Sequence, residues 1–393
     1  MFLLLLALVL IGVLVGVLFG LVPGLHPNTL VLFIPVFAAL GSFESIVLVV
    51  SIAVSNTLLD IIPSVFIAAP DEGNELSVLP THRMLLRGGG YDAVKIYVSA
   101  GYFSLLLCIV LLPVLIVFIP FFYNIIVPYV WILLVLIIAY MVLTEKRKIV
   151  ALIVLLMCST VGVLLGKIPE NNIMLLFPVF SGLFGASILL LQARNKSSYP
   201  RQNSSSCHIE KRQLFSSVFG GSSAGIAAGF LPGVGSSQMA TFATLQKSDE
   251  SFVATMGSIA ASNILLSIIS LWLIEKSRSG AAIILENSVS VLGPTEVMLM
   301  VITTLIAASM SVIIALFFAK KFSSIVQKFN FSSIGKLVIG AIVVIIFLTT
   351  GFVGIFLFLV CLSIGIYVNL SGVKRGIMMS VLLLPTILFF LHF

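Results

Sequence analysis

Long apolar segments separated by short polar loops run along the whole chain. In the first half they cover residues 2–22, 28–41, 44–69, 93–119, 123–143, 149–166 and 173–193. A polar stretch at 194–213 follows, and the series then resumes at 214–231, 236–247, 251–274, 295–319, 335–350, 352–370 and 376–393. About 20 apolar residues suffice for a helix to cross the hydrocarbon core of a membrane. The pattern predicts an all-α integral membrane protein, a polytopic helical bundle built from two similar halves.

Composition strengthens the membrane prediction. Hydrophobic residues make up 60% of the 393 residues, charged residues only 9%, and the mean hydropathy is +1.26. An ordinary soluble domain is about 25% charged. No stretch is long enough to form a separate soluble domain, so the chain is expected to be one membrane unit.

Two stretches of the sequence repeat each other. Residues 20–29 read GLVPGLHPNT and residues 229–238 read GFLPGVGSSQ. When their Pro-Gly pairs are aligned, the upstream glycines of the two halves also align, namely Gly12, Gly16 and Gly20 with Gly221, Gly225 and Gly229. Apolar segments interrupted by Gly and Pro at corresponding places in two halves are typical of discontinuous helices around a transporter's binding site.

The basic residues indicate how the two halves enter the membrane. Most Lys and Arg residues fall in the loops that share a side with the 194–213 linker, so this linker is predicted to be cytoplasmic. Each half has an odd number of segments, whether the second and third cross separately or form a re-entrant hairpin. The sequence therefore predicts a first repeat at 1–193, a cytoplasmic linker at 194–213 and a second, inverted repeat at 214–393 in the cell membrane.

The Gly/Pro interruptions are the first candidate binding elements. Proline lacks a backbone N–H, and glycine tolerates non-helical dihedral angles, so each Pro-Gly pair ends a helix. A helix that restarts beyond the break offers free N–H groups and a partial positive charge, which suit a carboxylate. The alternative is a pair of kinked helices with a packing role. The residues concerned are Pro23, Gly24, Asn28 and Thr29 in the first half, and Pro232, Gly233, Gly235, Ser236, Ser237 and Gln238 in the second.

Polar residues inside two apolar segments are the second group of candidates. Ser55, Asn56 and Thr57 interrupt the third segment, and Ser262 and Asn263 interrupt its counterpart. Such side chains are costly in a membrane unless they have partners. They can bind a carboxylate or supply oxygen ligands to Na⁺, and the alternative role is hydrogen bonding between helices.

Two titratable residues are candidates for ion coupling. Asp60 lies one turn after Asn56 in an apolar segment, and His26 lies inside the first Gly/Pro break. An ionisable residue within a span marks an ion or proton path by default. Neither residue has a counterpart of its kind in the second half, so a structural acid near Pro63 and a packing histidine remain the alternatives.

Catalytic and metal-binding motifs are missing from the sequence. The acids and histidines of the first long loop, among them Glu75, His82 and Asp92, have no zinc-ligand spacing, and no resident cofactor is expected beyond a coupling Na⁺. Arg83 and Arg87 are spaced like a solvated loop face, with an acidic partner or a lipid headgroup as the alternative. A membrane-embedded enzyme acting on lipids or glycans, or an assembly scaffold, is the rival to a transporter.

Several stretches in a fixed order carry a family resemblance. They are residues 20–29, 67–72 with 80–93, 231–235 with 257–263, and 350–354 with 372–376. In this order they resemble the large membrane subunit of the tripartite tricarboxylate transporters, the TctA type, in its compact archaeal form. The resemblance implies a permease that takes up a small organic anion, a di- or tricarboxylate, by symport with Na⁺ or H⁺. It also implies two partners, a small membrane subunit and an extracytoplasmic binding protein.

Overall fold

The computed structural model describes residues 2–22, 34–67, 78–168, 172–192, 200–202, 207–231, 235–236, 239, 248–289, 292–326 and 331–391. Every regular element within them is a helix. The α-helices of the first half are α1 (Phe2–Leu21), α2 (Ile34–Ala38), α3 (Ser42–Leu59), α4 (Ile61–Phe66), α5 (Val78–Leu86), α6 (Gly90–Ile126), α7 (Val130–Leu143), α8 (Lys148–Gly166), α9 (Asn172–Phe180) and α10 (Ser187–Gln192). Those of the second half are α11 (Lys211–Phe230), α13 (Asp249–Ile274), α14 (Gly280–Ser288), α15 (Pro294–Ile325), α16 (Phe331–Ser371) and α17 (Ser380–Leu391).

Among the described residues, 8 helical segments are long and apolar enough to cross a membrane. The expected all-α polytopic membrane fold is therefore confirmed. The helix α11 does not belong to this set, because serines, glycines and an N-terminal Lys211-Arg212 pair lower its hydropathy. It packs on α13 and α6, and its Ser217 and Ser222 are buried in this contact, while Ser216 and Ser223 are exposed.

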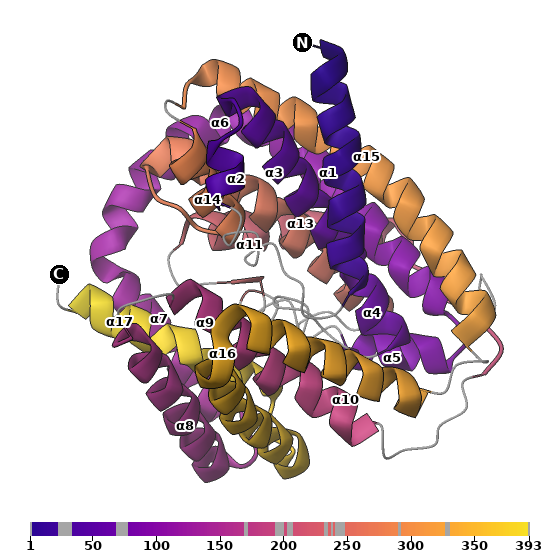
Figure 1. Cartoon of the computed structure of the whole chain (residues 1–393), viewed down its shortest axis with the longest axis vertical. Coiled ribbons are helices and arrows are strands. Elements are labelled where there is room, and N and C mark those ends of the chain that lie inside the picture. The colour runs from indigo at the N-terminus through magenta and orange to yellow at the C-terminus, as the bar shows by residue number, and fades with distance from the viewer. Residues whose placement is uncertain are drawn as a thin grey trace.

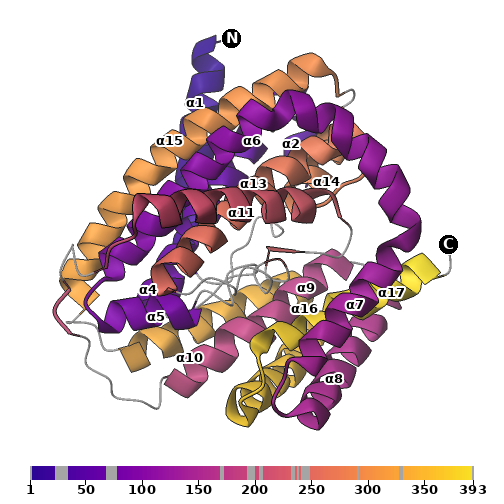
Figure 2. The same ribbon diagram turned by 180° about the vertical axis from the view of Figure 1, so that it is seen from behind.

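The helices form two bundles with separate hydrophobic cores (Figures 1 and 2). The first bundle contains α1–α6, α11 and α13–α15 around one large core. The second bundle contains α7–α10, α16 and α17 around two smaller cores. A short 3₁₀ turn, η2 (Val127–Tyr129), joins α6 of the first bundle to α7 of the second.

The repeated glycines have the same packing role in both halves. In the first half, a Cβ at Gly16 would lie 2.6 Å from Ile52 O and 2.7 Å from Ser55 Cβ, so α1 packs with backbone contact on α3. In the second half, a Cβ at Gly225 would collide with Ser262 and Ile259, the counterparts of Ser55 and Ile52 once a shift of two residues between the repeats is allowed. Glycine at these positions permits the close approach of two helices.

The two halves of the sequence interlock within both bundles. In the first bundle α6, from the first half, packs on α13, and α15, from the second half, packs on α3. In the second bundle α8 packs on α17, while α16 packs on α9, on α10 and on the π-helical turn η3 (Ser181–Ala186) between them. Each bundle is therefore built from both repeats, while the opposite insertion of the two halves stays a prediction.

The segments expected at 93–119 and 123–143 correspond to two helices, α6 and α7, which the 3₁₀ turn η2 separates. The boundary lies a few residues later than expected, because α6 continues through Pro113 and Pro120, which membrane helices tolerate when neighbouring groups satisfy the freed carbonyls. The expected break near Gly351 is also present, since Gly351 adopts φ +63° and kinks α16.

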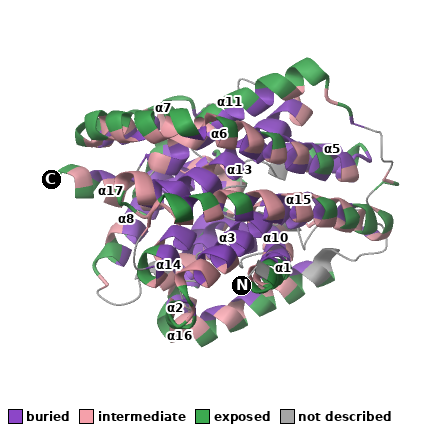
Figure 3. Ribbon diagram, turned by 90° about the horizontal axis from the view of Figure 1, so that it is seen from above, coloured by how far each residue is buried: buried purple, intermediate pink, exposed green. Residues whose placement is uncertain are grey.

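The helices that carry the mid-segment polar residues are the most enclosed ones. In 18-residue apolar windows of the spans that contain α3 and α13, 89% and 78% of the residues are buried, against 22% for a window of α16. Figure 3 shows α3 largely buried and the outer surfaces of α7, α15 and α16 exposed. Exposed Leu, Ile, Val and Phe side chains on these outer surfaces suit contact with lipid.

Candidate functional site

The second Gly/Pro break lies beside the polar residues of α13. Asn263 is half-buried, and its Nδ2 donates a hydrogen bond of 3.0 Å to Ser236 Oγ, which follows directly after the break. The structure thus brings together two groups of candidate residues that lie far apart in the sequence. This contact gives the second-half candidate site a defined geometry.

Residues around the second break also contact both bundles. Phe230 and Met239, on either side of the break, pack against the core of the first bundle and against the larger core of the second. Leu231, at the end of α11, is part of that larger second core. The Asn263–Ser236 contact therefore sits close to the boundary between the bundles, where ligand sites of helical membrane proteins commonly form.

The matching residues of α3 are more deeply buried. Asn56 is 1% exposed, and Ser55 is fully buried with its Oγ 2.8 Å from Ser311 Oγ of α15. Thr57 Oγ1 donates to Ala53 O within the same helix at 2.9 Å. Ser55 therefore has a hydrogen bond between helices, which is the packing role that its sequence allowed as the alternative.

The equivalent residue in α13 is bonded differently. Ser262 Oγ donates to Ser258 O at 2.6 Å, inside its own helix. Gly235, which precedes Ser236, is half-buried. The two halves of the candidate site thus differ, with interhelical bonding at Ser55 and an amide-to-hydroxyl contact at Asn263.

Asp60 is buried at the junction of α3 and α4. Its side chain is 6% exposed, and Pro63 follows in the next turn. Because proline has no N–H, the carbonyl of Leu59 loses its usual helical donor at this point. Ser64 Oγ donates to Asp60 O at 3.3 Å and so stabilises the irregular turn. The ion-coupling role of Asp60 and its alternative, a structural acid near Pro63, both stay predictions.

Nine of the predicted site residues lie outside the described part of the chain. In the first half these are Pro23, Gly24, His26, Asn28 and Thr29, and in the second half Pro232, Gly233, Ser237 and Gln238. Their roles stay predictions.

Arg83 of α5 and Arg87, directly after the end of α5, are ion-paired, which corrects their interpretation as a solvated loop face. Arg83 Nη2 lies 2.6 Å from Asp249 Oδ1, and Arg87 contacts Asp249 Oδ2 at 3.2 Å and Glu250 at 3.8 Å. The two acids occupy the first turn of α13, where negative charge also stabilises the helix. Sequence spacing alone missed this partner because α5 and α13 belong to different halves.

Part of the predicted linker is docked on the same region. Gln202 Oε1 accepts a hydrogen bond from Gly90 N, and its Nε2 donates to Leu85 O. The backbone N–H of Cys207 donates to Asp92 Oδ2 at 3.1 Å. Asp92 therefore has a structural role at the start of α6.

Cys207 lies in this docked part of the linker, and the pKa of its thiol is raised. Burial raises the pKa of Cys207 to about 11, and the nearby carboxylates of Glu250 and Asp92 add to the effect. Because the thiolate is the reactive form, we expect native Cys207 to be alkylated at pH 7.5 about 100-fold more slowly than an unperturbed thiol. The measurement is the maleimide labelling rate of a variant that keeps Cys207 alone, with the unfolded protein as control. A native rate equal to the unfolded rate would contradict the docking.

In the parts of the chain that the structure describes, no group of three or more His, Cys, Asp or Glu side chains could hold a metal ion. His82, whose pKa is lowered by burial, lies on α5 beside the ion-paired arginines.

Comparison with known proteins identifies the family. The family model described as "Tripartite tricarboxylate transporter TctA family" matches residues 6–380. The chain belongs to the TctA family. It is also 28% identical over 385 residues to the uncharacterized protein MJ1079 of Methanocaldococcus jannaschii, with 93% of this chain and 94% of the relative covered. No solved structure matches this TctA-family chain significantly.

Membership makes this TctA-family chain a multi-pass component of a tricarboxylate transporter and agrees with the expectation that it is not an enzyme.

The structure adds three polar residues that sequence reasoning missed in the core of the first bundle. Ser104 Oγ of α6 contacts Ser222 Oγ at 2.8 Å and Ser258 O at 2.9 Å, while Ser311 of α15 contacts Ser55. Ser104 and Ser311 hold corresponding positions in the two halves, a repeat signal that could have identified them.

Proposed function

We propose that this TctA-family protein is a permease for a small organic anion, a di- or tricarboxylate, coupled to Na⁺ or H⁺. The contact between Asn263 and Ser236 at the second Gly/Pro break carries the proposal. An amide donor, a hydroxyl and the helix restart predicted at 236–238 form a set of neutral donors. Such donors can bind a carboxylate without a buried Lys or Arg.

The site would be completed by the first half. Asn56 and Thr57 of α3, with the predicted helix end at Asn28 and Thr29, would supply the other wall. Ser55 would position α3 against α15 through its hydrogen bond to Ser311, and Ser262 would line the second wall beside Asn263. Asp60 would bind the coupling cation or carry the proton, because it is the buried acid nearest to Asn56 along α3. His26 is the second candidate for this coupling role.

Transport would follow from the division into two bundles. Substrate would bind between them, near Phe230 and Met239, and a movement of one bundle relative to the other would change the side from which it is accessible. The helix turn at 127–129 is where such a movement would be accommodated within the α6–α7 run. The protein would act in the cell membrane with its 194–213 linker in the cytoplasm.

Two partners would assist uptake. A small membrane subunit and an extracytoplasmic binding protein are implied by the tripartite family, and the binding protein would deliver the anion to the extracytoplasmic side.

A thermal-shift screen of the purified protein tests the proposal. We expect at least one di- or tricarboxylate to raise the unfolding temperature, because a ligand that binds only the folded state stabilises it by mass action. A ligand at 100 times its Kd contributes about 2.7 kcal/mol. Na⁺ should increase the shift if it is the coupling ion, and lower pH should do so if the proton is. No shift with any carboxylate, with or without Na⁺, would reject the carboxylate assignment.

A further inference from the structure

Two loops of the second bundle that are far apart in the sequence form one surface. Residues 144–147 connect α7 to α8, which begins at Lys148, and residues 372–374 connect α16, which ends at Ser371, to the 3₁₀ turn η5 (Arg375–Met379). Arg147 Nη1 donates to Ser371 O at 3.0 Å, and Lys374 N donates to Glu145 Oε1 at 3.2 Å. We refer to residues 144–148 and 371–375 together as the double-loop surface.

The double-loop surface is strongly basic. Its cations are Lys146, Arg147, Lys148, Lys374 and Arg375, and all except the half-buried Arg375 are exposed. Its acid, Glu145, is 6% exposed and accepts a backbone N–H, so its carboxylate is turned inward. Within the described residues, all salt bridges lie at the α5–α13 contact, so these five cations are left for an external anion.

Arg375 offers an anion a prepared donor. Its Nε donates to Asn369 Oδ1 at 2.7 Å, and Asn369 Nδ2 in turn donates to Gly365 O at 2.7 Å, which holds the guanidinium in place. Its Nη1 is buried and has no hydrogen-bond partner. A buried donor without an acceptor costs free energy, and a guanidinium fits the oxygens of a phosphate. The arginine is thus arranged for a phosphate-like ligand.

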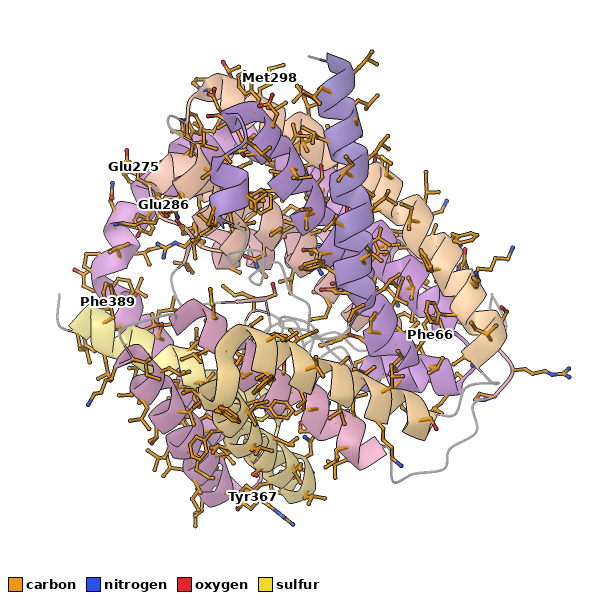
Figure 4. The ribbon with its side chains drawn as sticks, viewed as in Figure 1. Phe66, Glu275, Glu286, Met298, Tyr367 and Phe389 are labelled. Atoms are coloured by element: carbon orange, nitrogen blue, oxygen red, sulfur yellow. The ribbon has the colours of Figure 1, made fainter. Side chains whose placement is uncertain are left out.

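The surroundings of the double-loop surface are apolar, as at a membrane interface. Leu143, Ile149 and Leu370, each within a few residues of a cation, are 64%, 77% and 71% exposed. Tyr140 and Tyr367 are both 43% exposed, and Figure 4 shows Tyr367 near the end of α16 that leads into this surface. Aromatic residues concentrate where hydrocarbon meets the headgroup layer. A soluble anion would use the cations but not these apolar side chains.

We propose that the double-loop surface binds the headgroup of an anionic phospholipid. The lipid phosphate would accept hydrogen bonds from Arg147 and Arg375, Lys146 and Lys374 would add attraction, and the acyl chains would lie against the exposed side chains of α7, α8 and α16. Basic pockets between membrane helices on the cytoplasmic side bind such headgroups. The bound lipid would anchor the second bundle to the headgroup layer of the membrane. This role does not depend on which substrate the protein transports.

A lipid titration of the full-length protein tests this proposal. Detergent-purified protein is titrated with phosphatidylglycerol or phosphatidylcholine, and the thermal unfolding midpoint is followed. We expect phosphatidylglycerol to stabilise the wild type. The double variant Arg147→Gln/Arg375→Gln should need about 30-fold more of it, since each lost charge weakens binding about five- to six-fold. The matched control is Lys320→Gln/Lys321→Gln, which removes two exposed charges from α15 of the first bundle and should respond like the wild type.

Three results would overturn the proposal. These are equal stabilisation by phosphatidylcholine, an equal loss in the control variant, and equal protection by millimolar inorganic phosphate, which would indicate a soluble anion. Because Arg375→Gln also removes the bond to Asn369, Lys146→Gln/Lys374→Gln provides a second test on exposed side chains. This variant should fold like the wild type and bind phosphatidylglycerol several-fold more weakly, and wild-type binding would count against the proposal.

Discussion

Replacing Asn263 with alanine is expected to lower the affinity for the transported carboxylate by about 10- to 100-fold while the protein stays folded. A hydrogen bond to a charged group contributes about 1.5–3 kcal/mol, and 1.4 kcal/mol corresponds to a tenfold change. Asn263 supplies such a donor next to Ser236, at the boundary between the two bundles. The fold should survive because Asn263 is half-buried and its side chain is not part of a hydrophobic core.

The measurement is uptake of a labelled carboxylate into proteoliposomes, combined with the carboxylate-induced thermal shift. The control is Asn287→Ala, since Asn287 is an exposed amide on α14 whose Nδ2 donates within its own helix to Ile283 O. Asn56→Ala should resemble Asn263→Ala if both halves contribute to the site. Wild-type affinity in the Asn263 variant, or an equal loss in the Asn287 variant, would remove this residue from the site.

Replacing Gly221 with alanine is expected to destabilise the protein by about 1–3 kcal/mol, the usual cost of overpacking a closely packed core. A Cβ at this position would lie 2.6 Å from Ser258 Cβ and 2.7 Å from Thr255 O of α13. The Thr255 contact is with backbone and cannot be relieved by a rotamer change. The α11 and α13 helices would therefore have to separate, which would also move Ser262 and Asn263.

The adjacent residue provides a matched control. A Cβ at Gly220, also within α11, would meet nothing within 4 Å. Alanine at Gly220 should therefore leave the unfolding temperature unchanged or raise it, because alanine favours the helix over glycine by up to about 1 kcal/mol. Thermal unfolding of both variants in the same detergent makes the comparison. Equal effects at the two positions would show that α11 and α13 are not in close contact here.

Gly12 extends this experiment to the first repeat. Its Cβ would lie 2.6 Å from Ser51 Cβ and 3.0 Å from Leu48 O of α3. Gly12→Ala should therefore destabilise the protein about as much as Gly221→Ala, provided that the two repeats pack alike.

The sequence anticipated much of the local structure of the candidate site. Gly16 and Gly225 could be read as close-packing positions because a missing Cβ has a direct steric consequence that does not depend on the rest of the fold. Asn263 and Ser236 could be selected because polar residues and helix breaks are unfavourable in an apolar segment without a compensating role. The contact between them could not be anticipated, because 27 residues separate them and local patterns do not predict contacts at that separation.

Other features were beyond the sequence. The pairing of Arg87 with Asp249 and the contact of Ser104 with Ser222 connect different halves of the chain. A pattern of polar and apolar positions shows which face of a helix packs against other protein. It does not show which other helix contacts that face. For the same reason the basic loops around Arg147 and Arg375 looked like ordinary topology signals until the fold placed them side by side.

By itself, the sequence determined that this chain is an all-α membrane protein with a duplicated, Gly/Pro-interrupted pattern, because the length and hydropathy of each segment depend only on neighbouring residues. The tertiary structure alone decided that α6 packs on α13 and α15 on α3, so that each bundle draws on both repeats. The physical reason is that hydrophobic packing has no direction of its own. Which buried faces meet is decided by the mutual fit of glycines, serines and larger side chains in three dimensions.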